Sequence, residues 1–444
     1  MKKTLFLCFV LITLIVINLY AGGGSQSRSQ AGGTVTLQVW GGVPAEFGPQ
    51  ASIDLFNREF RDRGIQAEYT RFVNDTDGNI RLDTTLMSGD TIDVFINYYF
   101  DMLIRRIDAN MALDLTDRIN NDSSFDKNGF GGAIEAFTYN GRYYGIPSKL
   151  NNEGIMVNKD MFDAAGIPVP TSWTLREFRE IARRLTTGDG PNRTYGLFQN
   201  FGPTILWPIE STVMATLGGD WLYSNDGRSS NLDSPVIRQI VQTFYDIIVV
   251  DRSTPSWADI RAQRLTMEGF YLSGRSAMAY GSWGIRSVKD TAQYGHDFVT
   301  AFVPYPVLEG QSVNFYPNEI WGDLMTINPR SRNIDAAWEY IKWYTQQGML
   351  PMAEWGRIPI YSGFNPNETT SALLSGAERI LDFDSTLRVK ISPPTTRPAI
   401  PTITNRINEL RQILIEEVEA ILNGVKSVER GLGDAKSRSD ALLR

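Results

Sequence analysis

The chain has 444 residues, which is enough for two or three domains of ordinary size. Its 42% hydrophobic and 21% charged residues are typical of a soluble globular protein. The formal net charge is −7 and no stripe of Lys or Arg is present, which argues against nucleic-acid binding. His296 is the only histidine and Cys8 the only cysteine, which argues against a catalytic triad, a multi-histidine metal site and a disulfide.

The first residues have the pattern of a secretory signal. Two lysines precede an apolar run from Leu5 to Leu19, and Ala21 is followed by a Gly/Ser/Gln-rich stretch, 22–33. We therefore predict a signal peptide over 1–21 and a flexible linker over 22–33. An uncleaved membrane anchor is the alternative, although the apolar run is shorter than the roughly 20 residues of a spanning helix.

Strand and helix patterns then alternate. The predicted elements are strands at Thr34 to Trp40, Ile65 to Phe72 and Asp93 to Ile96, and helices at Ser52 to Phe60 and Asn79 to Met87. This βαβαβ order predicts a mostly parallel sheet.

The stretch from Asn140 to Trp173 predicts a crossing between two lobes. A short strand from Arg142 to Ile146 is stopped by Pro147, and a polar loop then leads into a second strand, Gly154 to Val157. A short helix follows that Gly166 is expected to end, and Thr171 or Ser172 to cap the next one.

The rest of the chain shows further helix and strand patterns. The patterns indicate helices at 174–186, 234–250, 331–344 and in the last forty residues, strands at Tyr195 to Phe198 and Ala277 to Trp283, and further crossings at 302–306 and 315–327.

The crossing stretch resembles the sugar-binding proteins of ABC importers, extracellular solute-binding protein family 1, which includes maltose-binding protein. The residues that carry the resemblance are Gly141, Tyr144 to Pro147, Asn158 to Asp160, Phe162, Ala165 to Ile167 and Pro170 to Trp173. The junction from Ser88 to Val94 is also similar, except that Ile92 stands where the family commonly has Pro. The resemblance covers nearly the whole chain after residue 33.

This resemblance implies an α/β periplasmic-binding-protein fold (type II), with two lobes, a multi-strand hinge and a ligand cleft. It implies an N-lobe over 34–143 and 318–348 and a C-lobe over 144–317 and 349–444. The expected function is non-catalytic capture of a sugar or oligosaccharide by lobe closure and its delivery to the permease of an ABC transporter. We expect a periplasmic or extracytoplasmic monomer without cofactor, metal or nucleic-acid partner. A lipid anchor is not expected, because Gly22 stands where lipoprotein relatives carry Cys.

A sugar site needs aromatic faces for C–H groups and polar side chains for hydroxyls. Such sites lie between lobes, at the carboxyl ends of strands. Asn97 to Tyr99 follow a strand, and Trp283 matches a stacking Trp of the family. Core or hinge packing is the alternative role for each aromatic. The candidate ligand residues are Trp40, Asn97, Tyr98, Tyr99, Asn151, Asn152, Trp221, Trp283, Trp321 and Arg357.

Two other functions stay open from the sequence. A secreted carbohydrate hydrolase would use two carboxylates, and the same fold could bind a polyamine or a metal complex. Two Asp-rich stretches, Asp75 to Gly78 and Asp126 to Gly129, are reminiscent of calcium loops but lack the Glu at the twelfth position. We interpret both as turns.

Overall fold

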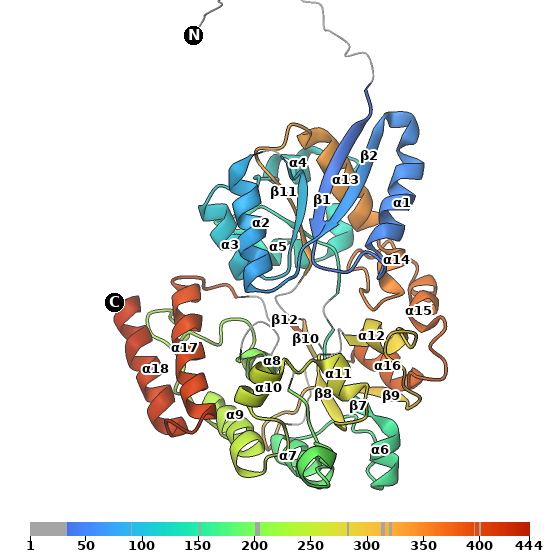
Figure 1. The fold of residues 1–444 in the computed structure, drawn as a ribbon. Helices are drawn as coiled ribbons and strands as arrows, with labels where there is room; N and C mark the ends of the chain where they lie inside the picture. Colours follow the sequence, from blue (N-terminus) through green and yellow to red (C-terminus); the bar gives the residue numbers. More distant parts are fainter. Residues whose placement is uncertain are drawn as a thin grey trace, which may run out of the picture.

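The computed structural model describes residues 33–89, 91–150, 152–199, 205–281, 284–311, 316–318, 322–394, 396–398 and 401–444. They form two α/β units, one above the other in Figure 1. We call the upper unit, which contains the first strands, the N-lobe and the lower unit the C-lobe. The predicted signal peptide and most of the linker lie outside the described residues. None of the helices that the described residues form has the length and apolar character of a membrane span.

The N-lobe is built on a five-stranded sheet with the order β2-β1-β3-β11-β6. The strands are β1 (Val35–Gly41), β2 (Ile65–Arg71), β3 (Val94–Asn97), β11 (Leu324–Ile327) and β6 (Ile146–Pro147). A hairpin is added by β4 (Thr138–Tyr139) and β5 (Arg142–Tyr143). The helices are α1 (Pro49–Glu59), η1 (Arg61–Arg63), α2 (Thr76–Ser88), α3 (Phe100–Asp108), α4 (Thr116–Asn121), η2 (Lys127–Phe130), α5 (Ala133–Ala136), α13 (Ile334–Gln346) and α14 (Leu350–Ala353).

The C-lobe sheet has β7 (Ile155–Asn158) between β8 (Met278–Tyr280) and β9 (Thr300–Val303), both antiparallel to it. A separate parallel pair is formed by β10 (Tyr316–Asn318) and β12 (Thr396–Pro398). The remaining helices are α6 (Lys159–Ala164), α7 (Leu175–Arg184), η3 (Gly190–Asn192), α8 (Trp207–Leu217), α9 (Pro235–Tyr245), η4 (Asp246–Val250), α10 (Trp257–Gln263), α11 (Met267–Tyr271), α12 (Ile285–Lys289), α15 (Pro366–Leu374), α16 (Phe383–Thr386), η6 (Leu387–Ile391), α17 (Ile407–Leu422) and α18 (Val428–Leu443).

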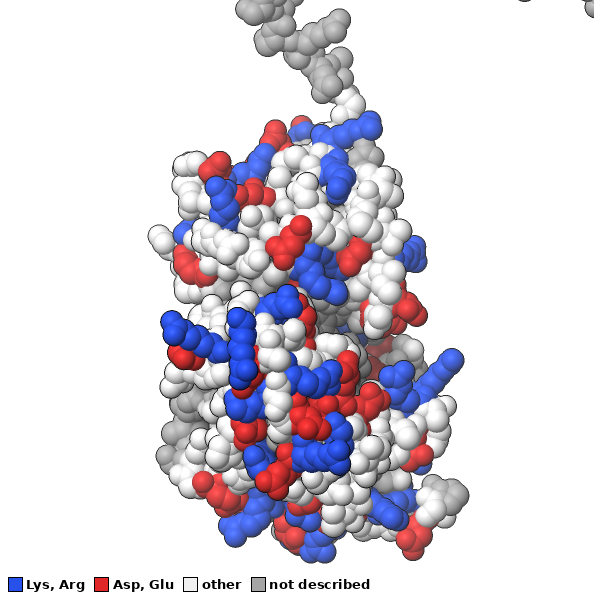
Figure 2. All heavy atoms as spheres, turned by 90° about the vertical axis from the view of Figure 1, so that its left-hand side faces the viewer, with Lys and Arg blue, Asp and Glu red and all other residues white. Residues whose placement is uncertain are grey.

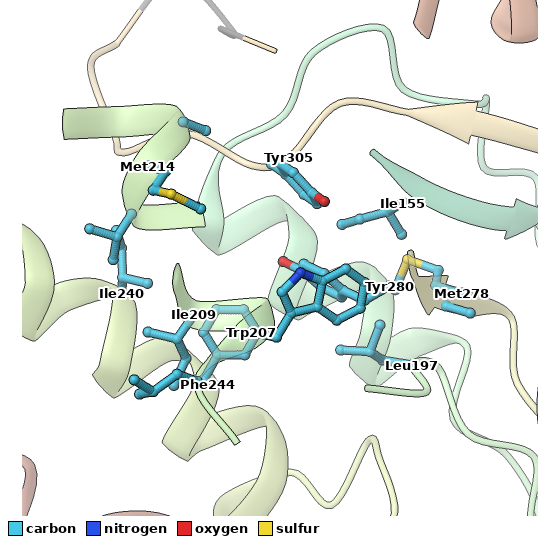
Figure 3. Close-up of a cluster of buried hydrophobic side chains, with 14 of the residues drawn as sticks. Ile155, Leu197, Trp207, Ile209, Met214, Ile240, Phe244, Met278, Tyr280 and Tyr305 are labelled. Atoms are coloured by element: carbon cyan, nitrogen blue, oxygen red, sulfur yellow. The ribbon is translucent and has the colours of Figure 1, made fainter. Parts of the chain in front are cut away.

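The C-lobe core lies between this sheet and α8 and α9. Figure 3 shows Tyr280 and Tyr305 beside Trp207, with Ile209, Ile240 and Phe244 of the two helices farther along. The rings of Tyr280 and Tyr305 are stacked, with centroids 5.5 Å apart and planes 13° apart. The core therefore fixes the start of α8, which is one wall of the site described below.

Local chemistry explains several element ends. Asn158 caps α6 by accepting a hydrogen bond from the Met161 N–H, and Gly166 has the positive φ of 62° expected after that helix. The expected cap of α7 is wrong, because Thr174 rather than Thr171 or Ser172 forms the capping box with Glu177. Three hydroxyl residues precede the helix, Thr171, Ser172 and Thr174, and only Thr174 is followed three residues later by a Glu.

One expectation about strands is confirmed and one is wrong. The three strands expected to form a parallel sheet do so as β2-β1-β3, and within this sheet only β11 runs antiparallel to its neighbours, β3 and β6. The segment from Tyr195 to Phe198 makes only isolated bridges, to Ser276 and Ala279. Its regular ladder is interrupted because the Gly196 N–H donates to Thr186 Oγ1 and the Leu197 N–H to the Ser253 carbonyl.

The crossing joins the two lobes as expected, with β6 as an edge strand of the N-lobe sheet, a position that tolerates Pro147. Apolar packing is continuous there, because Phe137 and Leu324 belong to the same buried cluster as the C-lobe core. The two Asp-rich stretches are turns that start helices, since Asp75 and Asp126 each accept a hydrogen bond from a backbone N–H three residues later.

Candidate functional site

A cavity of about 430 Å³ lies between the lobes, where α2 and α3 face α8 and α17. Figure 2 looks onto this side of the molecule and shows acidic and basic side chains interspersed around the hollow between the upper and lower parts. The volume lies in the usual range of small-molecule sites. The C-lobe wall is formed by Trp207, Glu210, Asn408, Arg411, Gln412 and Ile415.

The N-lobe wall is held by Arg106 of α3, which is 1% exposed. Its guanidinium donates to Asp83 Oδ1 at 2.7 Å, to Asn79 Oδ1 at 2.9 Å and to Asn97 Oδ1 at 2.5 Å. Burial lowers the pKa of Arg106, and the charge of Asp83 opposes this change. Asn79 and Asp83 line the cavity from α2, so Arg106 fixes α2 against α3 from beneath.

The C-lobe wall is held by an ion pair between two helices that are far apart in the sequence. Arg411 of α17 donates to Glu210 Oε2 of α8 at 2.8 Å. Arg411 Nε also lies 4.0 Å from Oδ2 of Asp101, which belongs to α3 on the opposite wall. This guanidinium therefore contacts carboxylates of both lobes.

Glu210 is only 1% exposed, and its second oxygen, Oε1, accepts no hydrogen bond from any described residue. Burial raises the pKa of the Glu210 carboxyl, the charge of Arg411 opposes this, and the charge of Asp101 adds to it. An unsatisfied buried acceptor is costly. This oxygen lacks a partner among the described residues, in a side chain that lines the cavity.

Two aromatic side chains line the same cavity, Tyr99 from the start of α3 and Trp207 from the start of α8. Because they come from opposite lobes, a ligand between the lobes can meet an apolar face and a polar edge on both sides.

This geometry is that of a binding cleft, and similarity to known proteins agrees with it. The family model described as bacterial extracellular solute-binding protein matches residues 50–349, more than half of the chain. The chain belongs to this family. The expectation of a solute-binding protein, rather than a secreted hydrolase, is thereby confirmed.

Individual relatives of the solute-binding family are more distant. A maltotriose-binding protein of Pyrococcus abyssi is 28% identical over 218 residues, which are 48% of this chain and 42% of that protein. The match thus spans less than half of that relative's length. An ABC substrate-binding protein from Listeria monocytogenes in complex with cycloalternan has a TM-score of 0.73 at 19% identity and covers 91% of this chain and 98% of its own. A solute-binding protein from Thermotoga lettingae bound with alpha-D-tagatose has a TM-score of 0.70 at 18% identity, with 92% and 100% covered. These structures confirm the expected two-lobed fold.

Of the residues predicted to bind ligand, Tyr99 lines the cavity. Its neighbours in the sequence do not. Asn97 is fully buried, and both ends of its amide are engaged within the N-lobe, by Arg106 and by Thr326 Oγ1 at 2.8 Å. The Tyr98 hydroxyl is buried and accepts a hydrogen bond from the Gly42 N–H at 2.5 Å. Burial and the charge of Asp323 raise the pKa of Tyr98.

Arg357 and Asn152 are each held by a distant segment of the chain. Arg357 Nε donates to Asp323 Oδ2 at 2.8 Å. Burial lowers the pKa of Arg357, but the charge and hydrogen bond of Asp323 together with Tyr98 and Tyr344 raise it overall. Asn152 donates to the carbonyl of Lys390 at 3.1 Å and its own carbonyl accepts from Lys390 Nζ at 2.8 Å. Both predicted residues therefore pair with segments distant in the sequence.

Two of the five remaining candidates can be placed. Trp221 is buried in the C-lobe core, and Trp40, at the end of β1, lies under the guanidinium of Arg81 at 5.6 Å. The other three predicted positions, Asn151, Trp283 and Trp321, lie outside the described residues.

Sequence reasoning missed Trp207, Glu210 and Arg411. Glu210 could have been found from the sequence, because it is the single charged residue of the segment that forms α8. Among the described residues no group of His, Cys, Asp and Glu side chains is arranged to hold a metal ion.

Proposed function

We propose that this protein is the extracytoplasmic receptor of an ABC importer and captures a sugar or oligosaccharide between its lobes. The single observation that carries this proposal is the Oε1 atom of Glu210, a buried acceptor without a partner among the described residues, in a cavity that also presents Arg411 and Tyr99. Sugar hydroxyls donate to carboxylates and accept from guanidinium groups, and sugar C–H faces pack on aromatic rings.

The relatives support the carbohydrate class. Maltotriose, cycloalternan and tagatose are named for the three proteins described above. We extend the class to this chain without choosing among these sugars. Trp283, Trp321, Trp40 and Asn151 stay predicted ligand residues, and the lobe boundaries stay predictions as well.

A polyamine is the second candidate, because four carboxylates line the cavity: Asp75, Asp83, Asp101 and Glu210. Three of them are already engaged by cations or by a helix start, since Asp75 caps α2, Asp83 pairs with Arg106 and Glu210 pairs with Arg411. A second positive charge close to Arg411 would be repelled. The engagement of these carboxylates favours a neutral sugar.

Capture follows from the cross-lobe position of the site. A ligand that contacts α3 and α8 together binds the closed arrangement more tightly than the open one and shifts the equilibrium toward it. The closed complex then presents the solute to the permease. Small-angle scattering is expected to give a smaller radius of gyration with bound sugar.

A thermal-shift screen with calorimetry tests the ligand class. The panel contains maltose, maltotriose, a cyclic oligosaccharide, tagatose and spermidine. We expect at least one sugar to raise the melting temperature, with no shift by spermidine and no release of reducing ends. A shift by spermidine alone would overturn the carbohydrate proposal in favour of a polyamine.

We further propose that the protein is exported, that residues 1–21 are removed and that no lipid is attached. The support is the signal-like pattern and Gly22 in the place of Cys. Intact mass of the protein from its native host tests this, and a diacylglycerol adduct would contradict it.

A further inference from the structure

Asp220, in the loop that follows α8, is hydrogen-bonded to a segment 182 residues later in the chain. One oxygen of Asp220, Oδ1, accepts from the backbone N–H of Thr402 at 2.6 Å and of Ile403 at 2.9 Å. The other, Oδ2, accepts from Thr402 Oγ1 at 2.6 Å. Two positions past the buried Trp221, the hydroxyl of Tyr223 donates to the Asn405 carbonyl at 2.8 Å.

The segment held in this way, 401–406, leads directly into α17. Arg406 precedes the helix with a positive φ of 59°, so the chain changes direction there. Within the next three turns α17 contributes Asn408, Arg411 and Gln412 to the cavity wall. The direction in which α17 starts therefore sets where the guanidinium of Arg411 lies.

The pair of helices α8 and α17 is thus linked twice. Glu210 joins Arg411 near the start of α8, and Asp220 joins Thr402 and Ile403 just beyond its end. Asp220 does not line the cavity. Hydrogen bonds from backbone N–H groups to a carboxylate are among the stronger ones in proteins and fix direction as well as distance.

We infer that Asp220 is a positioning residue for ligand binding: it orients the start of α17 and thereby places Arg411 and Glu210 toward the ligand. The inference rests on the proposed carbohydrate-binding function. The rest of α17 has its own support, because Leu410, Leu414 and Val418 are buried in the C-lobe core. Loss of the Asp220 contacts should therefore loosen the lead-in segment more than the fold.

The test compares Asp220→Ala with Asp220→Asn and a matched control. Asp226→Ala removes a neighbouring loop aspartate that accepts from Ser224 Oγ and the Arg228 N–H, within its own turn. For the sugar that gives the largest shift with wild type, we expect at least a tenfold weaker Kd for Asp220→Ala. We expect less than a threefold change for Asp220→Asn, whose amide oxygen still accepts both N–H groups, and no change for Asp226→Ala. Each Kd is measured well below the melting temperature of its variant.

Hydrogen exchange of the apo protein supplies a readout that needs no ligand. We expect the amides of 402–412 to exchange faster in Asp220→Ala than in wild type or Asp226→Ala. An unchanged Kd in Asp220→Ala, or unchanged exchange over 402–412, would overturn the positioning role. A melting temperature lowered equally in Asp220→Asn and Asp220→Ala, without a selective loss of affinity, would make Asp220 a stability residue only.

The two proposals fail in different ways. If wild type binds no sugar of the panel, the carbohydrate proposal fails, and the exchange data still decide whether Asp220 places α17. If wild type binds sugar and Asp220→Ala binds it equally well, only the positioning role fails. If Asp220→Ala does not fold, Asp220→Glu takes its place: the added methylene displaces the carboxylate, and we expect a weaker Kd there as well.

Discussion

The two walls of the cavity are built from similar residues but satisfied differently. On the N-lobe wall, Asp83 and Asn79 both have a partner inside the lobe, which is Arg106. On the C-lobe wall, Glu210 keeps one buried oxygen without a partner among the described residues. Under the proposed function, the N-lobe wall is therefore complete before the ligand arrives, whereas the C-lobe wall leaves an acceptor for the ligand.

The largest expected effect concerns the completed wall. Arg106→Met removes one partner of a buried charge cluster and leaves Asp83, Asn79 and Asn97 without their donor. We expect a loss of about 3 to 5 kcal/mol in the free energy of unfolding, measured by urea denaturation. The matched control is Arg105→Met, an exposed neighbour on the cavity rim, for which we expect a change below about 0.5 kcal/mol. Equal stabilities of the two variants would remove the distinction between the walls.

The next effect concerns the incomplete wall. Glu210→Gln replaces a charged acceptor by a neutral one and weakens the pair with Arg411. We expect sugar affinity to fall about tenfold to a hundredfold, or about 1.4 to 2.8 kcal/mol by calorimetry. Glu419→Gln, on α17 but hydrogen-bonded to Trp257 Nε1 outside the cavity wall, is the control and should bind normally. Normal binding by Glu210→Gln would mean that the free oxygen does not contact the ligand.

A smaller effect is expected in the pH dependence of the free energy of unfolding. Since burial raises the pKa of Glu210, the folded protein holds a proton that the unfolded chain releases. The stabilisation from this proton is fully present below the usual glutamate value of 4.5 and is lost as pH rises through the folded pKa. We therefore expect the apo free energy of unfolding of wild type, minus that of Glu210→Gln, to decrease over this window. Parallel pH profiles of the two proteins would contradict the raised pKa.

The smallest effect concerns the contact between the walls. Arg411 Nε and Asp101 Oδ2 are 4.0 Å apart, the outer limit of an ion pair. Asp101→Asn should weaken sugar binding by less than about 0.6 kcal/mol, and the effect should vanish in about 0.5 M salt. Asp108→Asn, at the exposed end of the same helix, is the control. A larger, salt-independent loss would make Asp101 a direct ligand residue.

The sequence allowed the fold to be predicted because its signals are local. The alternation from Val35 onward, the apolar spacing of α17 and the crossing motif around Pro147 each act within a few residues. Whether an aromatic residue belongs to the site depends on the direction in which its side chain points, which local sequence does not specify. An aromatic residue after a strand or turn has the same pattern whether it enters the core, as Trp221 does, or lines the cavity, as Tyr99 does.

Side-chain pairs between residues far apart in the chain have no local sequence pattern that predicts them. Nothing near Asp220 indicates that Thr402 is its partner, and Arg411 stands beside the apolar stripe of an ordinary amphipathic helix. Asn97 was a reasonable polar candidate at a strand end, but a buried arginine nine residues later uses its oxygen. Polar strand ends are satisfied from inside the lobe or by a ligand, and a single sequence does not distinguish the two.

The position of β11 has a consequence for biosynthesis. This strand lies between β3 and β6 in the N-lobe sheet, although it comes about 180 residues after β6 in the chain. Until residues 324–327 have left the ribosome, β3 remains an edge and β6 has no strand to pair with. The N-lobe of the nascent chain should therefore stay unfolded until then, since contacts this distant in sequence form late. We expect a chain ended at residue 320 to be digested rapidly by protease in its N-lobe, and one extended through α13 to resist.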